Sequence, residues 1–278
     1  MGKNKFKINK NKMLPFAISD CPAGLLDCKI GGIPYYPKDM EWPLGKCGAS
    51  KDKPLVFLAQ FNMAYIPSIP NFPKRGILQF FISEEMYGKS PRGERKDEQL
   101  NFRVVYHKTV KTDASVLMSE NDVPISNLTL SEDVRFPVKG SYLLTPGIIL
   151  NERMPSTDYR AKETFLEYYN QQKGQDAKDI PEGYRQLFEN LYPIFRKPIV
   201  SLGGFPSFVQ GDIRRNHEEY RKYDTTILVI SSDPCPFVNG KYAPKIAWGD
   251  DGCANFMMPI ESLKKKDFSQ VLYDWDCY

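Results

Sequence analysis

The chain contains a series of short apolar runs, each of strand length and bounded by glycine or proline. The clearest, residues 54–61, reads PLVFLAQF and has Gln60 as its one polar member. Because the run does not alternate between apolar and polar side chains, it predicts a strand buried on both faces. Further strand candidates are residues 76–82, 100–108, 139–150 and 226–231. The pattern therefore favours a fold organised around buried β-strands.

Two helices are predicted in the middle of the chain, and a short helix-like segment is predicted within residues 248–278. Residues 157–172 and 182–195 place aromatic and apolar side chains three and four positions apart, which is typical of one face of a helix. A polar stretch, residues 171–179, connects them.

The composition excludes several functional classes. The 278 residues carry a formal net charge of only +4, so nucleic acid is an improbable partner. No apolar run approaches the roughly 20 residues that cross a bilayer, and we expect a cytoplasmic protein without a membrane interaction. The six cysteines are dispersed and only two histidines accompany them, so neither a metal site nor another cofactor is expected.

Two parts of the chain contain similar short motifs in the same order. Residues 202–206 (LGGFP) match residues 30–34 (IGGIP), and the apolar runs that follow stand at similar distances. This spacing predicts an internally duplicated α+β fold with mostly antiparallel β-sheet halves related by a pseudo-two-fold axis. The halves would be residues about 24–150 and 198–278, joined by a helical segment 157–195. We expect a basic N-terminal arm, residues 1–12, and a single domain, residues 13–278.

The C-terminal stretch, residues 248–278, is rich in aromatic side chains and should be packed inside the fold. Residues 273–278 (YDWDCY) have no counterpart in the first half. They are therefore predicted to form the strand that closes the fold.

Several motifs in order resemble the YwqG-like family. They are the two Gly-Gly-x-Pro runs, Trp42-Pro43, residues 54–60 and 76–81, then Gln210 with Asp212, Trp248-Gly249-Asp250 and Trp275-Asp276-Cys277. The resemblance implies a compact α+β fold with an internal repeat that occurs widely in bacteria, and no established activity. Ser231-Ser232-Asp233 departs from the Gln-x-Asp that often follows the second apolar strand.

The Gly-Gly pairs have two possible roles. Adjacent glycines can present backbone amides to an anion, but the spacing fits neither a Walker loop nor a dinucleotide fingerprint. A turn with positive φ and a close backbone approach is the favoured interpretation.

The leading functional hypothesis is a non-enzymatic binding or interaction domain. Polar and aromatic residues of the motifs would line a cleft between the halves, namely Trp42, Gln60, Gln210, Asp212, Trp248 and Asp250. The ligand would be an unknown small molecule or a protein partner, such as a toxin in an immunity-type pair. Amides beside apolar strands, such as Gln60, Gln79 and Asn255, would equally serve a structural hydrogen-bond network.

The rival hypothesis is a carboxylate-dependent hydrolase or transferase acting on a small polar substrate. Its acid and base would come from Asp212, Asp250 and Asp276, provided that two of these carboxyl groups converge. Turn formation is the alternative role for Asp250. No role in catalysis is expected for His107, His217 or Cys277, and residues 84–97 are expected to form an exposed loop.

Overall fold

Ten strands follow one another across a single antiparallel sheet, in the order β13-β12-β9-β8-β1-β6-β2-β3-β4-β5, and β7 also pairs with β1. The computed structural model describes residues 9–88, 95–131, 134, 136–194, 197–234, 237–238 and 240–278. The strands of this sheet are β1 (Lys10–Ser19), β2 (Lys29–Gly31), β3 (Val56–Asn62), β4 (Ile77–Ile82), β5 (Phe102–His107), β6 (Ser141–Pro146), β7 (Leu150–Arg153), β8 (Val200–Gly203), β9 (Thr225–Ser231), β12 (Cys253–Met258) and β13 (Leu272–Asp276). A separate hairpin pairs β10 (Phe237–Val238) with β11 (Lys241–Tyr242).

Helices are few among the described residues. The α-helices are α1 (Tyr159–Lys173), α2 (Arg185–Leu191) and α3 (Ile260–Lys265). Single 3₁₀ turns occur at η1 (Gly48–Ser50), η2 (Glu85–Gly88), η3 (Ala114–Val116), η4 (Glu182–Tyr184), η5 (Ile213–Arg215) and η6 (Glu218–Tyr220). The predicted strands at 54–61, 76–82, 100–108 and 226–231 are confirmed as β3, β4, β5 and β9, and both predicted helices are present.

The N-terminal strand β1 lies in the middle of the sheet. It pairs with β6 and β7 on one side and with β8 on the other. Of the predicted basic arm, residues 1–8 lie outside the described residues, while Lys10 and Lys12 belong to β1. Lysines and a proline are more typical of a strand at the edge of a sheet. Its Pro15 is accommodated opposite Ser201, and its carbonyl oxygen accepts a hydrogen bond of 2.8 Å from the Gly147 amide.

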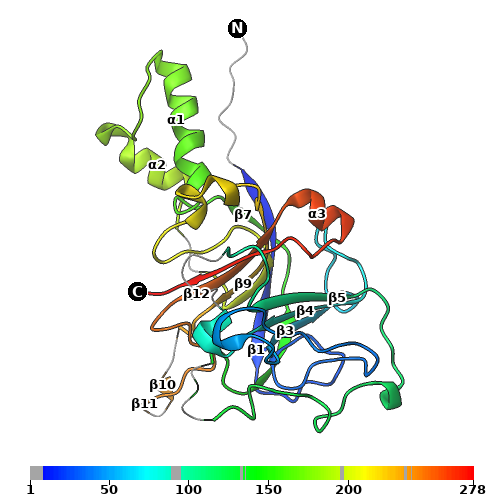
Figure 1. Ribbon diagram of the computed structural model, residues 1–278. Helices are drawn as coiled ribbons and strands as arrows, with labels where there is room; N and C mark the ends of the chain where they lie inside the picture. Colours follow the sequence, from blue (N-terminus) through cyan, green and yellow to red (C-terminus); the bar gives the residue numbers. More distant parts are fainter. Residues whose placement is uncertain are drawn as a thin grey trace.

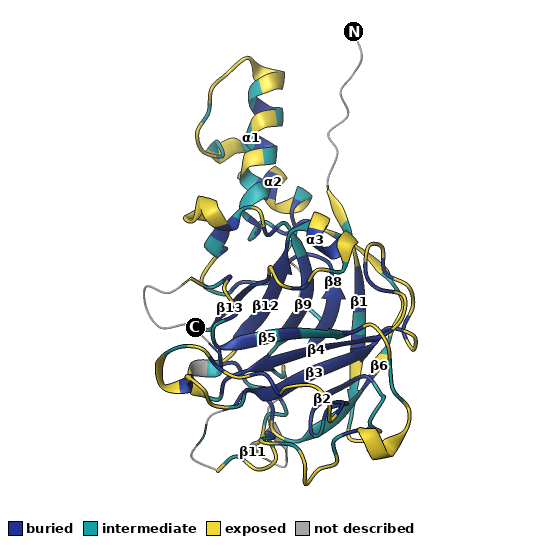
Figure 2. Ribbon diagram, turned by 45° about the vertical axis from the view of Figure 1, so that its right-hand side comes forward, coloured by how far each residue is buried: buried dark blue, intermediate teal, exposed yellow. Residues whose placement is uncertain are grey.

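The sheet curls into a nearly closed barrel, so that its two ends pack against each other (Figures 1 and 2). Phe80 of β4 and Phe256 of β12 stand seven positions apart in the strand order, yet their ring centroids are 4.9 Å apart. Phe102 of β5 lies 5.1 Å from Tyr273 of β13. These rings belong to one large buried cluster, which is the main core of the protein.

Gln99 connects the two ends of the curled sheet. Its side-chain oxygen accepts from the Val104 amide of β5 at 2.9 Å, and its Nε2 donates to the carbonyl oxygens of Phe268 and Ser269 at 2.8 and 2.9 Å. We call this line of contact, between β5 and residues 266–269, the seam. Burial of Gln99 is tolerable because its amide is satisfied from both sides.

Helices α1 and α2 form a hairpin that projects from the barrel (Figure 1). Asp158 caps α1 by accepting from the Arg160 amide, and Gly174 ends the helix with φ of 63°. The hairpin has a small core of its own around Phe165, Tyr169 and Phe188, to which Met154 and Phe205 of the barrel side contribute. Its base is therefore packed onto the barrel and its tip is exposed (Figure 2).

The predicted duplicated α+β fold is wrong. The structure is one mostly antiparallel sheet that forms a barrel with few helices, and the described residues show no clear duplicated halves. Residues 24–150 are not self-contained, because β6 pairs with β1 as well as with β2, and β1 in turn pairs with β8. The similar motifs reflect similar local requirements and do not mark separate halves.

The Gly-Gly pairs illustrate such a requirement, and their prediction as positive-φ turns is confirmed. Gly31 and Gly32 have φ of 67° and 77°, and Gly203 and Gly204 have φ of 74° and 78°. A Cβ atom on Gly31 would lie 2.2 Å from the Gly140 carbonyl oxygen, and one on Gly203 would lie 2.4 Å from that of Lys12. Only glycine fits where two backbones approach so closely after a strand.

The segment predicted as an exposed loop, residues 84–97, is buried at its C-terminal end. Residues 89–94 lie outside the described residues. Asp97 is buried and accepts a hydrogen bond of 2.6 Å from the Tyr223 hydroxyl, and the Tyr273 amide of β13 donates to the Lys96 carbonyl oxygen at 3.2 Å. Residues 95–97 thereby cover the edge strand β13.

Removing residues 274–278 should abolish cooperative unfolding. The deletion removes Trp275 from the core and Asp276, whose Oδ2 accepts from the backbone amides of Val209 and Gln210 at 2.9 and 2.7 Å. Thermal melts followed by circular dichroism would show a broad transition. The matched control lacks only Tyr278, which is 81% exposed, and should melt like the full chain. A sharp transition for the longer deletion at the full-length temperature would contradict this role of β13.

Candidate functional site

The residues predicted to line a cleft lie in separate surroundings. Trp42 is buried in an aromatic cluster with Tyr36 and Phe81, and its Nε1 donates to the Leu55 carbonyl oxygen at 2.9 Å. Trp248 is fully buried in the main core beside Trp275, with ring centroids 6.2 Å apart. These contacts explain both tryptophans as packing residues.

Gln60 belongs to a buried hydrogen-bond chain across β3, β4 and β5. His107 bonds through Nε2 to Gln79 Oε1 at 2.7 Å, and Gln79 Nε2 donates to Gln60 Oε1 at 2.9 Å. Gln60 Nε2 donates in turn to the carbonyl oxygens of Leu25 and Asp27, both at 2.9 Å. Each amide is thus fully used, which is the structural alternative that the sequence left open. Burial lowers the pKa of His107 to about 4, so the imidazole is neutral near pH 7.

Asp212 is buried in an ionic cluster at the base of the hairpin. Its carboxylate accepts from Arg214 Nε at 2.9 Å and from Arg214 Nη2 at 2.7 Å, and Arg214 also reaches Asp158 at 3.1 Å. Asp158 makes a second bidentate pair with Arg160, at 2.8 and 2.6 Å. Burial alone would raise the pKa of Asp158, but the hydrogen bonds from Arg160 and the charge of Arg214 hold that pKa below its ordinary value.

Gln210, Asp276 and Asp250 lie near the C-terminal strand. The Gln210 side chain is exposed and donates to the Cys277 carbonyl oxygen at 2.6 Å. The Asp276 carboxylate is buried and accepts hydrogen bonds from the backbone amides of Val209 and Gln210. Asp250 is exposed in the turn that the Gly252 amide closes onto the Trp248 carbonyl oxygen at 2.9 Å. The contacts of Asp212 and Asp276 are thus structural, and Asp250 occupies a turn.

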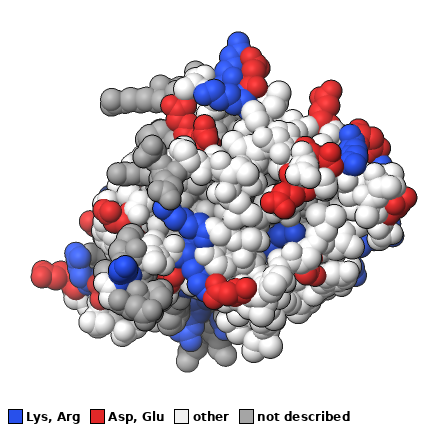
Figure 3. Space-filling view, turned by 90° about the horizontal axis from the view of Figure 1, so that it is seen from below, with Lys and Arg blue, Asp and Glu red and all other residues white. Residues whose placement is uncertain are grey.

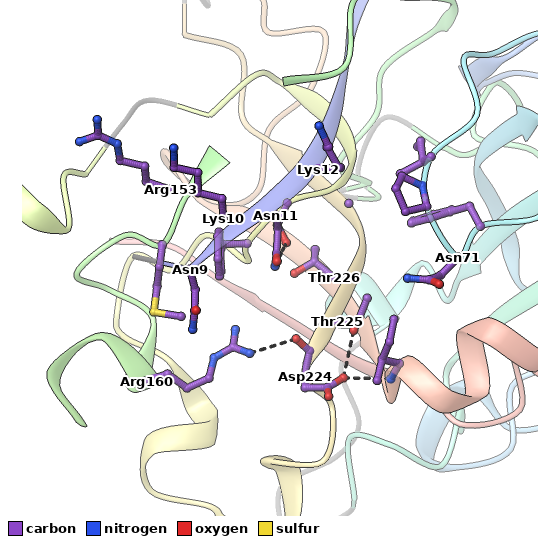
Figure 4. A pocket seen from close by; sticks show the side chains of 18 residues that line it. Asn9, Lys10, Asn11, Lys12, Asn71, Arg153, Arg160, Asp224, Thr225 and Thr226 are labelled. Carbon is purple, nitrogen blue, oxygen red and sulfur yellow. Dashed lines mark hydrogen bonds between the residues drawn. The ribbon is translucent and has the colours of Figure 1, made fainter. Parts of the chain in front are cut away.

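A cavity of about 1000 Å³ opens elsewhere, between the barrel and the base of the hairpin (Figure 4). It is bounded by β1, the end of β7, the Gly203–Phe205 turn after β8, the start of β9 and the first residue of α3. Its polar lining includes Asn9, Asn11, Asn71, Thr225 and Thr226, and its apolar lining includes Ile69, Phe72, Met154 and Phe205. We call it the hairpin cavity. The sequence-predicted site residues are not in its lining.

The charges around the hairpin cavity are unbalanced. Among the described residues that line it, the cations are Lys10, Lys12, Arg153 and Arg160, and the one carboxylate is Asp224. The Asp224 carboxylate accepts hydrogen bonds from the Ile260 amide at 2.9 Å and from the Thr225 hydroxyl at 3.0 Å. Within the described part of the chain, Lys10, Lys12 and Arg153 make no ion pair, and all three are exposed.

Arg160 is held rigidly where the other three cations are free to move. Arg160 donates hydrogen bonds from Nε and Nη2 to the Asp158 carboxylate. Its Nη1 donates to the Asp224 carbonyl oxygen at 3.2 Å (Figure 4). One hydrogen on each Nη atom is left over, and the Arg160 side chain is 24% exposed. The cavity thus combines one preorganised cation with three adaptable ones.

A buried ion pair fixes the neighbouring wall of the cavity. Lys197 Nζ pairs with Glu152 Oε1 and donates to the Phe205 carbonyl oxygen at 2.8 Å. The other carboxylate oxygen of Glu152 accepts from the Phe205 amide at 2.8 Å. A Cβ atom on Gly204 would lie 2.3 Å from this oxygen, so the second Gly-Gly turn is needed to form the wall.

Other reactive groups offer no additional centre. In the described ranges, no group of three or more His, Cys, Asp or Glu side chains is placed to hold a metal ion. None of the helices described is long and apolar enough to span a bilayer. Lys, Arg, Asp and Glu are interspersed over the surface seen from below (Figure 3).

Comparison with known proteins identifies the family. The model of the domain of unknown function DUF1963 matches residues 28–277. The chain belongs to this family. No curated protein matches it. The DUF1963 match extends from β2 to β13, so it includes the whole closed sheet except β1, and also Arg153, Arg160 and Asp224 of the hairpin cavity.

Sequence reasoning missed the hairpin cavity. A usable signal was present in β1, where Lys10 and Lys12 are two residues apart and therefore lie on the same face of a strand. Arg153, Arg160 and Asp224 stand in no motif. They meet only because β7, α1 and β9 converge on the end of β1.

Asp212→Asn should destabilise the protein by about 3 kcal/mol, because it leaves the buried Arg214 guanidinium without its bidentate carboxylate. Asp250→Asn, in an exposed turn, should change stability by less than about 0.5 kcal/mol. Urea denaturation with an unchanged slope would measure both values. Equal effects of the two substitutions would contradict the distinction drawn here between a cluster residue and a turn residue.

His107 should make the protein less stable in mild acid. Its folded-state pKa of about 4 lies below the unfolded value of about 6.5, so its contribution is complete above pH 6.5 and is lost as the pH falls towards 4. The loss should reach about 3 kcal/mol. His107→Gln should flatten the stability profile over this interval, whereas His217→Gln, at an exposed site, should not. Urea denaturation at a series of pH values would decide the matter.

Proposed function

We propose that this protein binds a small organic anion in the hairpin cavity and does not catalyse a reaction on it. The observation that carries the proposal is the set of four cations around one cavity whose single carboxylate is already used. A volume of about 1000 Å³ is at the upper end of cavities that hold small ligands.

The chemistry of the lining supports an anion that also has an apolar or sugar-like part. Arg160 offers two hydrogens in a fixed plane, which suits a phosphate or carboxylate group. Lys10, Lys12 and Arg153 can adapt to a second negative group at the opening. Phe72, Ile69 and Met154 would cover carbon atoms, while the amides and hydroxyls would bind polar substituents.

The state of the one carboxylate in the described lining favours binding over catalysis, because Asp224 already accepts hydrogen bonds from the Ile260 amide and the Thr225 hydroxyl. The described lining contains no His, Cys or Ser. The rival hypothesis of paired carboxylates has less support, because Asp212 is paired with Arg214 and Asp276 receives backbone amides. The assignment to a bacterial YwqG-like branch, a cytoplasmic location and a protein partner such as a toxin stay predictions from the sequence.

Isothermal titration with matched ligand pairs would test this proposal. We would titrate adenosine monophosphate against adenosine, and glucose 6-phosphate against glucose. We expect at least one of the two phosphate esters to bind, and we expect the matching neutral compound, adenosine or glucose, not to bind. The variant Lys12→Gln/Arg153→Gln, which alters exposed side chains, should weaken that binding about tenfold or more.

The control Lys108→Gln changes an exposed lysine outside the cavity lining and should bind like the wild type. If neither phosphate ester bound, or if the double variant bound them with wild-type affinity, the hairpin cavity would not be the anion site.

A further inference from the structure

We propose a second anion-binding site at the seam, formed by Lys46, Arg103 and Lys266. It is independent of the hairpin cavity and shares no lining residue with it. These three cations line a cavity of about 460 Å³, in which Glu98 and Asp267 are the carboxylates. The Lys266 ammonium also donates to the carbonyl oxygens of Asn71 and Leu263. Arg103 belongs to β5, whereas Lys266 follows α3, so the cavity lies between the two ends of the curled sheet.

The backbone brings Lys46 and Arg103 together. The Lys46 amide donates to the Leu100 carbonyl oxygen at 2.7 Å, and Arg103 Nη2 donates to the Leu44 carbonyl oxygen at 3.3 Å. Residues 44–46 are thereby held beside residues 100–103. The proximity is electrostatically unfavourable, since the charge of Arg103 is the main cause of a lowered pKa at Lys46.

The two carboxylates in the lining, Glu98 and Asp267, are engaged with other groups. Asp267 accepts from the Ser269 amide at 3.0 Å, and Glu98 lies 3.7 Å from Arg95. No ion pair of Lys46 or Arg103 is present among the described residues. Two like charges that are held together, and that make no ion pair among the described residues, form an arrangement that an anion would stabilise.

The expected ligand is a small multivalent oxyanion group, such as phosphate. The planar guanidinium of Arg103 suits two oxygens of one such group, and a lysine ammonium can approach a third. Bound there, the anion would connect β5 to the segment after α3, in parallel with the bridge that Gln99 makes. Its measurable consequence is stabilisation of the closed barrel.

Thermal unfolding in inorganic phosphate and in chloride, at equal pH and ionic strength, would test the seam site. Phosphate well above its dissociation constant should raise the Tm of the wild type by about 2–4 °C. Lys46→Gln/Arg103→Gln should abolish this shift. In chloride the same variant should melt no lower than the wild type, because the repulsion between the two cations is gone.

Two further variants separate this site from the hairpin cavity. Lys12→Gln/Arg153→Gln should keep the phosphate shift, and the charge-conserving Lys46→Arg should keep it too. If the double variant at the seam does not fold, Lys46→Gln alone, at an exposed side chain, should reduce the shift by about half. The proposal fails if phosphate does not raise the wild-type Tm, if neutral seam variants keep the full shift, or if Lys12→Gln/Arg153→Gln loses it.

Discussion

Closure of the sheet depends on aromatic packing between strands that are far apart in the strand order. The ring contact between Phe80 and Phe256, at 4.9 Å, forms where the sheet bends over and covers its own apolar face. Since β3, β4 and β12 are buried along their whole length, a flat sheet would expose two apolar faces to water. Curling buries one of these faces, and Tyr36 and Trp42 pack against Phe57 and Phe81 on the other.

Two sets of buried polar side chains in this barrel form satisfied hydrogen-bond networks, and this explains why several polar motif residues proved structural. Leaving one buried amide or carboxylate without partners costs about 1–3 kcal/mol. The Gln60, Gln79 and His107 chain and the Asp158, Arg160, Asp212 and Arg214 cluster satisfy nearly every donor and acceptor. Arg160 differs because two of its hydrogens remain for a ligand at the hairpin cavity.

Local features of the fold could be predicted from the sequence. The run at 54–61 is almost entirely apolar, which is enough to predict a buried strand. The apolar spacing of residues 157–172 is enough to predict a helix without knowledge of the tertiary structure. The central place of β1 could not be predicted, because Pro15 and the flanking lysines resemble those of an edge strand or arm, and pairing with β8 joins residues about 190 apart. The two Gly-Gly-x-Pro motifs suggested a duplication, but they recur because each follows a strand at a close approach of two backbones. Which strands pair with each other cannot be seen in such motifs.

The candidate site was less predictable than the fold. Asp212 and Asp250 stand in equally distinctive motifs, yet one is buried against Arg214 and the other is exposed in a turn. Burial of a carboxylate depends on which distant cation reaches it, and no local pattern encodes that. The hairpin cavity is likewise assembled from single residues of several elements, so only the Lys10 and Lys12 alternation was visible beforehand.

The covered edges of the barrel have a consequence for its behaviour in a crowded solution. An open antiparallel sheet has free amides and carbonyls along its two outer strands, which invite strand addition by another chain and so aggregation. Here the Tyr273 amide of β13 is occupied by the Lys96 carbonyl oxygen, and Gln99 binds both β5 and the segment leading to β13. A few residues before β5 thus occupy one backbone amide on each outer strand, Val104 on β5 and Tyr273 on β13, and leave fewer positions open to intermolecular pairing.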